Sequence, residues 1–380
     1  MIQIIDKHFC CGCEGCVQIC PKQCISFNED EKGFRYPLVD KDICINCGLC
    51  DKVCPFLNLT NTRNPIKVIA AINPDEELRM KSSSGGIFTI LAEHTIKAGG
   101  VVFGACFDDK WEVKHDFVDT VDGISTFRGA KYVQSKICRA FIKVKTFLDK
   151  DRKVLFSGTG CQIAGLRKFL RKEYDNLLTV EIACHGVPSP AVWRAYINKV
   201  AKGNLSKIRN INFRDKRNGW NGYGLAITTN EETIYERASE NQYMQSFLRD
   251  LCLRPSCSNC PSKKGASGAA LIIGDFWGVE SIRPEIYDNK GCSLVVINSA
   301  YGEQIINELN INHSKITYED GYRYNPCFIS PLSENRYAPI FWSKFKKHGI
   351  DACKTTISII NNNKLIRILA LIYSKLILRD

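Results

Sequence analysis

The feature that most constrains this 380-residue chain is a pair of cysteine runs near its start. Both runs have the spacing C-x2-C-x2-C-x3-C, followed by Pro21 and by Pro55. The eight cysteines are Cys10, Cys13, Cys16, Cys20, Cys44, Cys47, Cys50 and Cys54. Three closely spaced thiolates suit three corners of a 4Fe-4S cubane, and in two-cluster ferredoxins the fourth cysteine of each run ligates the other cluster. The runs therefore predict two 4Fe-4S clusters.

The crossed pattern also predicts the ligand sets. Cys54 completes the cluster of the first run's Cys10, Cys13 and Cys16, and Cys20 completes the cluster of the second run's Cys44, Cys47 and Cys50. A zinc site or a set of disulfides is the weaker alternative, because zinc usually takes two well-separated C-x2-C pairs. Cys11 and Cys24 are left over, and we expect them to be packed thiols.

Composition narrows the setting and the partners. Twenty cysteines without a visible basic and apolar leader favour free thiolates in a cytoplasmic protein, and no apolar run is long enough to span a membrane. The formal charge of +12 calls for a negatively charged partner. Because the basic residues are spread along the chain without a nucleic-acid-binding motif, we expect no nucleic acid. An acidic redox protein such as ferredoxin, or an anionic substrate, fits better.

After a polar linker at 58–65, segments typical of strands and helices alternate. The predicted strands are 67–72, 101–107, 153–157, 177–183, 270–276 and 293–299. Ile137, Phe141, Val144 and Leu148 predict a helix with one buried face, and Ser189 with Pro190 predicts the start of a helix through Val200. This alternation predicts an α/β domain with a mixed or largely parallel sheet.

Five more cysteines lie in predicted loops. Cys161 begins a helix in "LFSGTGCQIAGL", where the dipole favours a thiolate, and Ile163 there breaks the dinucleotide-binding pattern. We expect a third 4Fe-4S cluster at Cys161, Cys184, Cys257 and Cys260, with Cys252 as a substitute ligand. A zinc site or free thiols is the alternative. His185 is either a proton donor near this site or a structural histidine.

Two further segments are candidates for binding. "KSSSGGIF" at 81–88 opens a helix whose start suits a phosphate, although Ser84 as a simple N-cap explains it equally well. The segment 364–380 is an apolar helix with Lys364, Arg367, Lys375 and Arg379. It is either docked on the body or in contact with a membrane surface or a partner.

Together these motifs resemble the beta subunits of coenzyme F-420 hydrogenase and dehydrogenase, in their bacterial branch. The resemblance rests on the cysteine motifs with "SSGGIF", "RGAKYVQS", "GTGCQ", "CHGVPSP" and "CSNC" followed by "IIGDFWG". It implies FAD beside the clusters. It also implies that Cys161, Cys184, Cys257 and Cys260 hold the inner cluster, that Lys131 and His185 are catalytic, and that the cofactor is bound by Ser83, Ser84, Gly85, Gly86, Lys131, Tyr132, Gln134, Gly158 and Thr159. Gly160 and Ala270 depart from the family pattern and leave the substrate open.

The expected organisation is a small two-cluster ferredoxin-like domain at 1–58, a larger α/β flavin domain at 66–345 and a C-terminal amphipathic helical segment at 350–380. The expected function is a ferredoxin-linked, flavin-dependent oxidoreductase. It would move electrons between 4Fe-4S clusters and FAD, with hydride transfer to or from a small acceptor, either a deazaflavin coenzyme or a bacterial substrate. The alternative is a subunit that relays electrons to a partner enzyme and has no substrate of its own.

Overall fold

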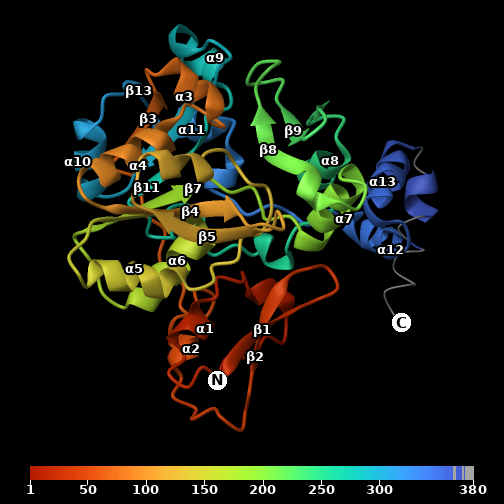
Figure 1. Ribbon diagram of the computed structural model, residues 1–380, viewed down its shortest axis with the longest axis horizontal. Coiled ribbons are helices and arrows are strands. Elements are labelled where there is room, and N and C mark those ends of the chain that lie inside the picture. The colour runs from red at the N-terminus through yellow and green to blue at the C-terminus, as the bar shows by residue number, and fades with distance from the viewer. Residues whose placement is uncertain (363–364, 370–371, 373–380) are drawn as a thin grey trace.

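A mixed eight-stranded sheet forms the centre of the molecule (Figure 1). The computed structural model describes residues 1–362, 365–369 and 372. The strand order is β13-β3-β12-β11-β7-β6-β4-β5. In chain order these strands are β3 (Lys67–Ile72), β4 (Val101–Phe107), β5 (Val113–Val118), β6 (Val154–Thr159), β7 (Leu177–Ile182), β11 (Leu271–Asp275), β12 (Ser293–Ile297) and β13 (Asn312–Ile316).

Four neighbouring strands, β4, β6, β7 and β11, run parallel, and the flanking pairs are antiparallel. Strands β4, β6 and β7 are buried over most of their length, as is usual for parallel strands covered on both faces. The carboxyl ends of β6, β7 and β11 therefore meet at one edge, where ligands bind in open α/β sheets. The segments beginning at Gly160, Ala183 and Phe276 leave the sheet at this edge.

Helices cover both faces of the sheet. One face packs against α4 (Ile87–Lys97) and α10 (Ala300–Glu308), and the other packs against α5 (Ala140–Leu148) and α6 (Gly160–Leu170). Shorter helices surround the sheet: α3 (Glu76–Lys81), α9 (Val279–Ile282) and α11 (Tyr318–Arg323). The predicted helix is confirmed in part: Phe141, Val144 and Leu148 form the buried face of α5, whereas Ile137 is buried in the core but lies before the helix, which begins at Ala140.

A second core lies beside the sheet, at the right of Figure 1. It combines the antiparallel strands β8 (Ile208–Asp215), β9 (Gly224–Thr229) and β10 (Thr233–Arg237) with four helices. These helices are α7 (Pro190–Val200), α8 (Gln242–Leu248), α12 (Ala338–His348) and α13 (Ala352–Asn361). The Ser189 side chain accepts a hydrogen bond from the Val192 N–H, which confirms the predicted start of α7.

The N-terminal module lies below the α5 and α6 side of the sheet in Figure 1. It contains α1 (Gly15–Ile19), α2 (Leu49–Lys52) and the hairpin of β1 (Ile25–Glu29) with β2 (Arg35–Val39). The short helix η1 (Lys7–Phe9) packs against η4 (Pro255–Cys257) from the main body. Residues far apart in the sequence therefore meet where the two modules join.

All six predicted strands are confirmed, with ends that agree to within two residues. Helix α4 begins differently from the sequence-based alternative, because Gly86 in a left-handed conformation is its N-cap, rather than Ser84. Within the described residues, no helix has both the length and the apolar character needed to cross a membrane. The described part of the segment at 350–380 begins at the end of η7 (Gly349–Asp351) and continues into α13, whose Ala352 and Cys353 are buried; Lys364, Lys375 and Arg379 lie outside the described residues.

Candidate functional site

The first three cysteines of the first run lie beside the last cysteine of the second run. Burial is the main cause that raises the pKa of the Cys16 thiol, and the nearby charges of Cys10, Cys54 and Cys50 add to it. At Cys13 the neighbouring Cys11 thiol lowers the thiol pKa, but burial and the charges of Cys16 and Cys54 outweigh it, so the pKa is raised overall. The chain therefore brings together the donor set predicted for one cluster.

The second predicted donor set lines a separate hollow of the same module. Cys20, Cys44, Cys47 and Cys50 border this hollow together with Cys24. The Ile2 N–H donates to Cys50 Sγ over 3.3 Å, and Cys20 Sγ lies 3.4 Å from Cys24 Sγ. Cys24 is buried, as expected of a packed thiol, but it also borders the second donor set.

Two side chains of the N-terminal module fix it on α5. Glu14 accepts hydrogen bonds from the N–H groups of Ile137 and Cys138 and pairs with Arg35 over 2.9 Å. The Gln18 side chain accepts from two N–H groups in the first turn of α5. The Gln18 contacts satisfy helix-start N–H groups that lack intrahelical partners, and the Glu14 contacts hold the two residues just before the helix cap, so the module is joined to the body by directional bonds.

Helix α6 connects the N-terminal thiols with the inner cysteines. Its residue Gly165 lies so close to the first run that an added Cβ would be 2.9 Å from Cys13 Sγ. The Cys161 thiol in the first turn of α6 lies next to the Cys11 thiol, which raises the pKa of Cys161, and Cys11 in turn lies next to Cys13. A continuous line of thiols thus runs from the first donor set to the edge of the main sheet.

The four inner cysteines converge at that edge from three segments. Cys161 follows β6, Cys184 follows β7, and Cys257 and Cys260 come from the loop around η4. Burial raises the pKa of Cys184 well above its usual range, and the charges of Cys257, Cys161 and Cys260 raise it further. Burial likewise raises the pKa of Cys257 to about 12 and that of Cys260 to about 11.

This environment opposes the expectation that the helix dipole keeps Cys161 as a thiolate. Its contact with Cys11, and then burial, raise the pKa of Cys161 well above its usual range. Four half-buried thiols that oppose one another's ionisation would become thiolates when a cationic iron–sulfur group binds, because metal binding releases the thiol protons. Within the described residues, no His, Cys, Asp and Glu side chains form a ready-made group of three or more that could hold a metal ion.

Polar groups of the chain already point at these thiols. The Val187 N–H donates to Cys257 Sγ over 3.4 Å, and the Thr159 hydroxyl lies 3.2 Å from Cys161 Sγ. The Lys263 amine donates to the carbonyls of Cys184 and Cys327, over 2.5 and 2.7 Å. Hydrogen bonds to sulfur and nearby positive charge are the means by which proteins adjust bound clusters, so the donor chemistry here fits a 4Fe-4S group.

Cys252, expected as a possible substitute ligand, lies in the second core rather than with the four inner cysteines. It is fully buried in the second core and 3.5 Å from the Ser246 hydroxyl. Three residues near the inner set were not assigned to it from the sequence: Cys11, Cys327 and Arg254. For Cys11 and Arg254 the sequence pointed to this site only through adjacent predicted ligands, because Cys11 follows Cys10 and Arg254 precedes "PSC".

The turn predicted to hold a phosphate is bonded to its own chain. The Ser83 hydroxyl accepts from the Ala130 N–H over 2.7 Å, and the Ser84 hydroxyl donates to the Cys292 carbonyl over 2.8 Å. The Gly85 N–H donates to Ser293 Oγ over 3.0 Å. The Ser83 contact brings the segment of Lys131, Tyr132 and Gln134 next to this turn, although the polar atoms of both segments have partners within the chain.

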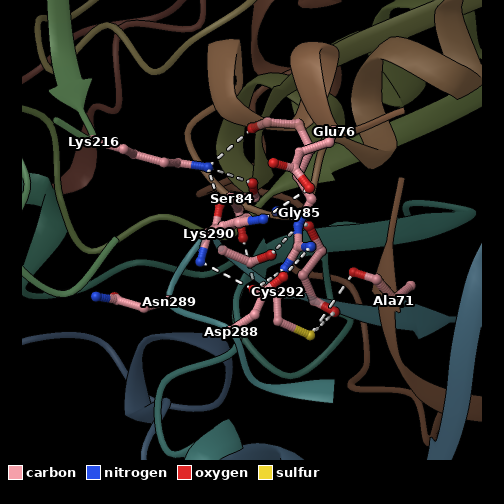
Figure 2. A network of polar contacts seen from close by, with 12 residues as sticks. Ala71, Glu76, Ser84, Gly85, Lys216, Asp288, Asn289, Lys290 and Cys292 are labelled. Atoms are coloured by element: carbon pink, nitrogen blue, oxygen red, sulfur yellow. Dashed lines mark hydrogen bonds and ion pairs between the residues drawn. The ribbon is translucent and has the colours of Figure 1, made fainter. Parts of the chain in front are cut away.

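Near this turn, the amines of the buried Lys216 and the half-buried Lys131 have no hydrogen bond to a carboxylate among the described residues. Figure 2 shows the Lys216 amine, which donates to the carbonyls of Arg79, Ser84 and Lys290 over 2.7 to 3.0 Å. Burial, and then the charge of Arg214, lower the pKa of Lys216 to about 7. The Lys131 amine likewise donates only to carbonyls, and its burial lowers the pKa to about 7.

Arg214 adds a third positive charge beside the turn. It makes a two-point contact with Asp275 and donates to the Tyr132 hydroxyl over 3.2 Å, but its buried Nε has no hydrogen-bond partner among the described residues. Two amines bonded to carbonyls and one guanidinium N–H without a hydrogen-bond partner leave donors that an anion could accept from. These residues therefore fit an anionic group such as a cofactor phosphate.

The remaining predicted residues are spread along the sheet edge. The His185 ring is half-exposed and hydrogen-bonded to Asp250 over 2.5 Å. No hydrogen bond among the described residues joins it to Lys131, the other residue expected to be catalytic. Thr159 is the N-cap of α6 in a capping box with Gln162, while Gly158 packs against the Gln162 side chain. Gln134 points away from the turn toward Arg254 and the Cys11 carbonyl.

Comparisons with known proteins identify relatives of both modules. Residues 151–320 match the family model for the C terminus of the coenzyme F420 hydrogenase/dehydrogenase beta subunit, and residues 9–58 match the 4Fe-4S dicluster domain. No curated protein matches the chain significantly. One matching solved chain comes from the F420-reducing NiFe hydrogenase complex of Methanosarcina barkeri. It shares 16% identity, with 78% of this chain and 92% of that chain covered and a TM-score of 0.45.

Proposed function

We propose that this chain is an iron–sulfur flavoprotein oxidoreductase. The premise is that residues 151–320 match the coenzyme F420 hydrogenase/dehydrogenase beta subunit family and that residues 9–58 match the 4Fe-4S dicluster domain. The proposal includes three 4Fe-4S clusters, FAD, and hydride exchange with a small acceptor. The observation that carries it is the line of thiols from the N-terminal module through Cys11 to Cys161 at the sheet edge.

Each cofactor has a proposed set of residues. Cys10, Cys13, Cys16 and Cys54 would hold one cluster, Cys20, Cys44, Cys47 and Cys50 the second, and Cys161, Cys184, Cys257 and Cys260 the third. When bound, clusters supply single-electron chemistry and a flavin joins it to two-electron chemistry. The chain itself holds the donor sets close together through Glu14, Gln18 and α6, which electron transfer between them requires.

The proposed flavin position is the region between the turn at Ser83 and the side chains of Lys131, Tyr132 and Arg214. Its support is the group of basic donors without carboxylate hydrogen bonds at Lys131 and Lys216, and the ring of Tyr132, which stacks on Phe247 at 4.8 Å. The amines of Lys131 and Lys216 would hold the phosphates of FAD, with Ser83 at the same turn. The dinucleotide-binding glycine pattern is absent from "GTGCQI", so we do not place a nicotinamide coenzyme here.

One observation favours the relay as a second function. The polar atoms of Ser83, Ser84 and Gln134 already have partners within the chain, as a segment with a purely structural role would. In that case the chain would accept electrons from ferredoxin or another redox protein and deliver them to a catalytic partner.

Anaerobic turnover distinguishes the two functions. The chain, reconstituted with iron, sulfide and FAD, is mixed with reduced ferredoxin and then with a deazaflavin or other two-electron acceptors. Repeated turnover of such an acceptor by the isolated chain is the expected result. Reduction of one-electron dyes alone, with no turnover of any two-electron acceptor, would contradict the enzyme and favour the relay.

A further inference from the structure

Arg254 is a buried cation at the junction of the N-terminal module and the sheet edge. Its residue exposure is 1%. The backbone N–H of Arg254 donates to the Val187 carbonyl over 3.0 Å, and the chain continues directly into η4 and Cys257. Its guanidinium points the other way, into the N-terminal module, where it donates to the carbonyls of Cys10 over 2.7 Å and Arg35 over 3.0 Å.

The charge of Arg254 has no carboxylate partner in the part of the chain that the structure describes. Its remaining donors reach Gln134 Oε1 over 3.0 Å and Cys10 Sγ over 3.6 Å. The rings of Tyr36 and Phe34 lie 4.3 and 5.4 Å from its central carbon. The neighbouring Arg35 differs, because Glu14 neutralises it. A buried cation without a counter-ion is strongly unfavourable, so an anionic group is expected next to Arg254.

The chain is shaped to let this cation approach the first cysteine run. Gly12 has a φ of +68°, and an added Cβ there would be 2.8 Å from Gln134 Nε2 and 3.1 Å from an Arg254 terminal nitrogen. On the side of the main body, the Cys257 N–H donates to the Arg254 carbonyl over 3.0 Å, so the segment that carries this cation also carries a thiol of the inner set. One cation therefore lies next to both predicted donor sets.

We propose that Arg254 is a positioning residue whose charge raises the reduction potentials of the two clusters on either side of it, at Cys10 and at Cys161. Reduction adds negative charge to a cluster, and a desolvated cation beside it stabilises the reduced form. The cluster of Cys20, Cys44, Cys47 and Cys50 lies in the separate hollow and keeps its potential. This inference rests on the proposed function, because it requires clusters at the first and inner donor sets.

The test is a redox titration followed by electron paramagnetic resonance, on the full chain and its variants. Arg254→Gln removes the charge and is expected to lower two of three potentials together. A tenfold loss in the equilibrium constant for reduction corresponds to about 59 mV for a one-electron couple. Arg254→Lys keeps the charge and is expected to stay close to the unsubstituted chain. Arg35→Gln is the matched control, since Glu14 already neutralises that cation.

Two results would overturn the inference. One is unchanged potentials in an iron-replete Arg254→Gln variant. The other, decisive if Arg254→Gln fails to load iron, is an Arg254→Lys variant with its potentials lowered although its charge remains. Iron counting on the unsubstituted chain separates this failure from failure of the proposed function: too little iron for three clusters contradicts the function, whereas a full count with no effect of Arg254 contradicts only this inference.

Discussion

At the scale of single residues, the contact between Cys13 and α6 depends on one glycine. Gly165 lets the first cysteine run approach the helix that carries Cys161. Gly15 faces the same interface, but an added Cβ there would meet only ordinary contacts at 3.7 to 3.9 Å. The two positions therefore form a matched pair for testing how closely the donor sets must approach.

Gly165→Ala is expected to lower the free energy of unfolding by about 1–3 kcal/mol, because the new methyl group overpacks against Cys13. The same variant is expected to bind less iron. Gly15→Ala is the control and is expected to change stability little. Anaerobic thermal unfolding and iron determination measure both effects. The same stability and the same iron content in the two variants would contradict the view that the close contact between Gly165 and Cys13 is needed.

The inner ligand set makes a second prediction at this scale. Cys184→Ser is expected to remove about four irons per chain, the content of one cubane. Cys252→Ala is expected to keep all the iron, because Cys252 is packed in the second core. Iron and acid-labile sulfide report the difference. Loss of iron from a Cys252→Ala variant that folds normally would contradict the proposed inner ligand set.

At the scale of elements, His115 of β5 joins two strands of the main sheet to the loop that contains Ser135. Its ring is bonded to Ser135 Oγ over 2.6 Å and to the Ser157 carbonyl over 3.0 Å. Burial lowers the pKa of His115 to about 4. The ring links β5 and β6 to the segment that contains Tyr132 and Gln134, so its protonation affects how this segment is held.

Acid is therefore expected to destabilise the fold through His115. Below its usual pKa of 6.5 the unfolded chain takes up a proton that the folded chain excludes, so stability falls as the pH drops from about 6.5 to about 4. The shift corresponds to an effect on the order of 3 kcal/mol. His115→Gln is expected to flatten this part of the pH profile of thermal unfolding. A variant with the same pH dependence as the unsubstituted chain would contradict this role.

The elements with strong local signals could be predicted from the sequence. The strands of the main sheet that lie between its helices are apolar runs, and the start of α7 has both a cap and a proline. The strands β8, β9 and β10 were missed, because only their pairing with one another and with the second core makes them strands. The same limit applies to Arg254, which owes its position to contacts with residues over 200 positions away.

At the scale of the whole molecule, the formal charge of +12 suits an acidic electron donor. Reduction of the chain by ferredoxin is therefore expected to slow as ionic strength rises, by about tenfold between low and high salt. Reduction by a small neutral dye is the control and is expected to change little. A rate with ferredoxin that does not depend on salt would contradict electrostatic steering.

The central claim, that three clusters and one flavin share this chain, is tested most directly by counting them. The protein is purified anaerobically, FAD is offered back, and iron, acid-labile sulfide and flavin are determined per chain. The predicted result is about twelve irons, about twelve sulfides and one FAD. About eight irons without flavin would contradict the claim and leave a two-cluster relay.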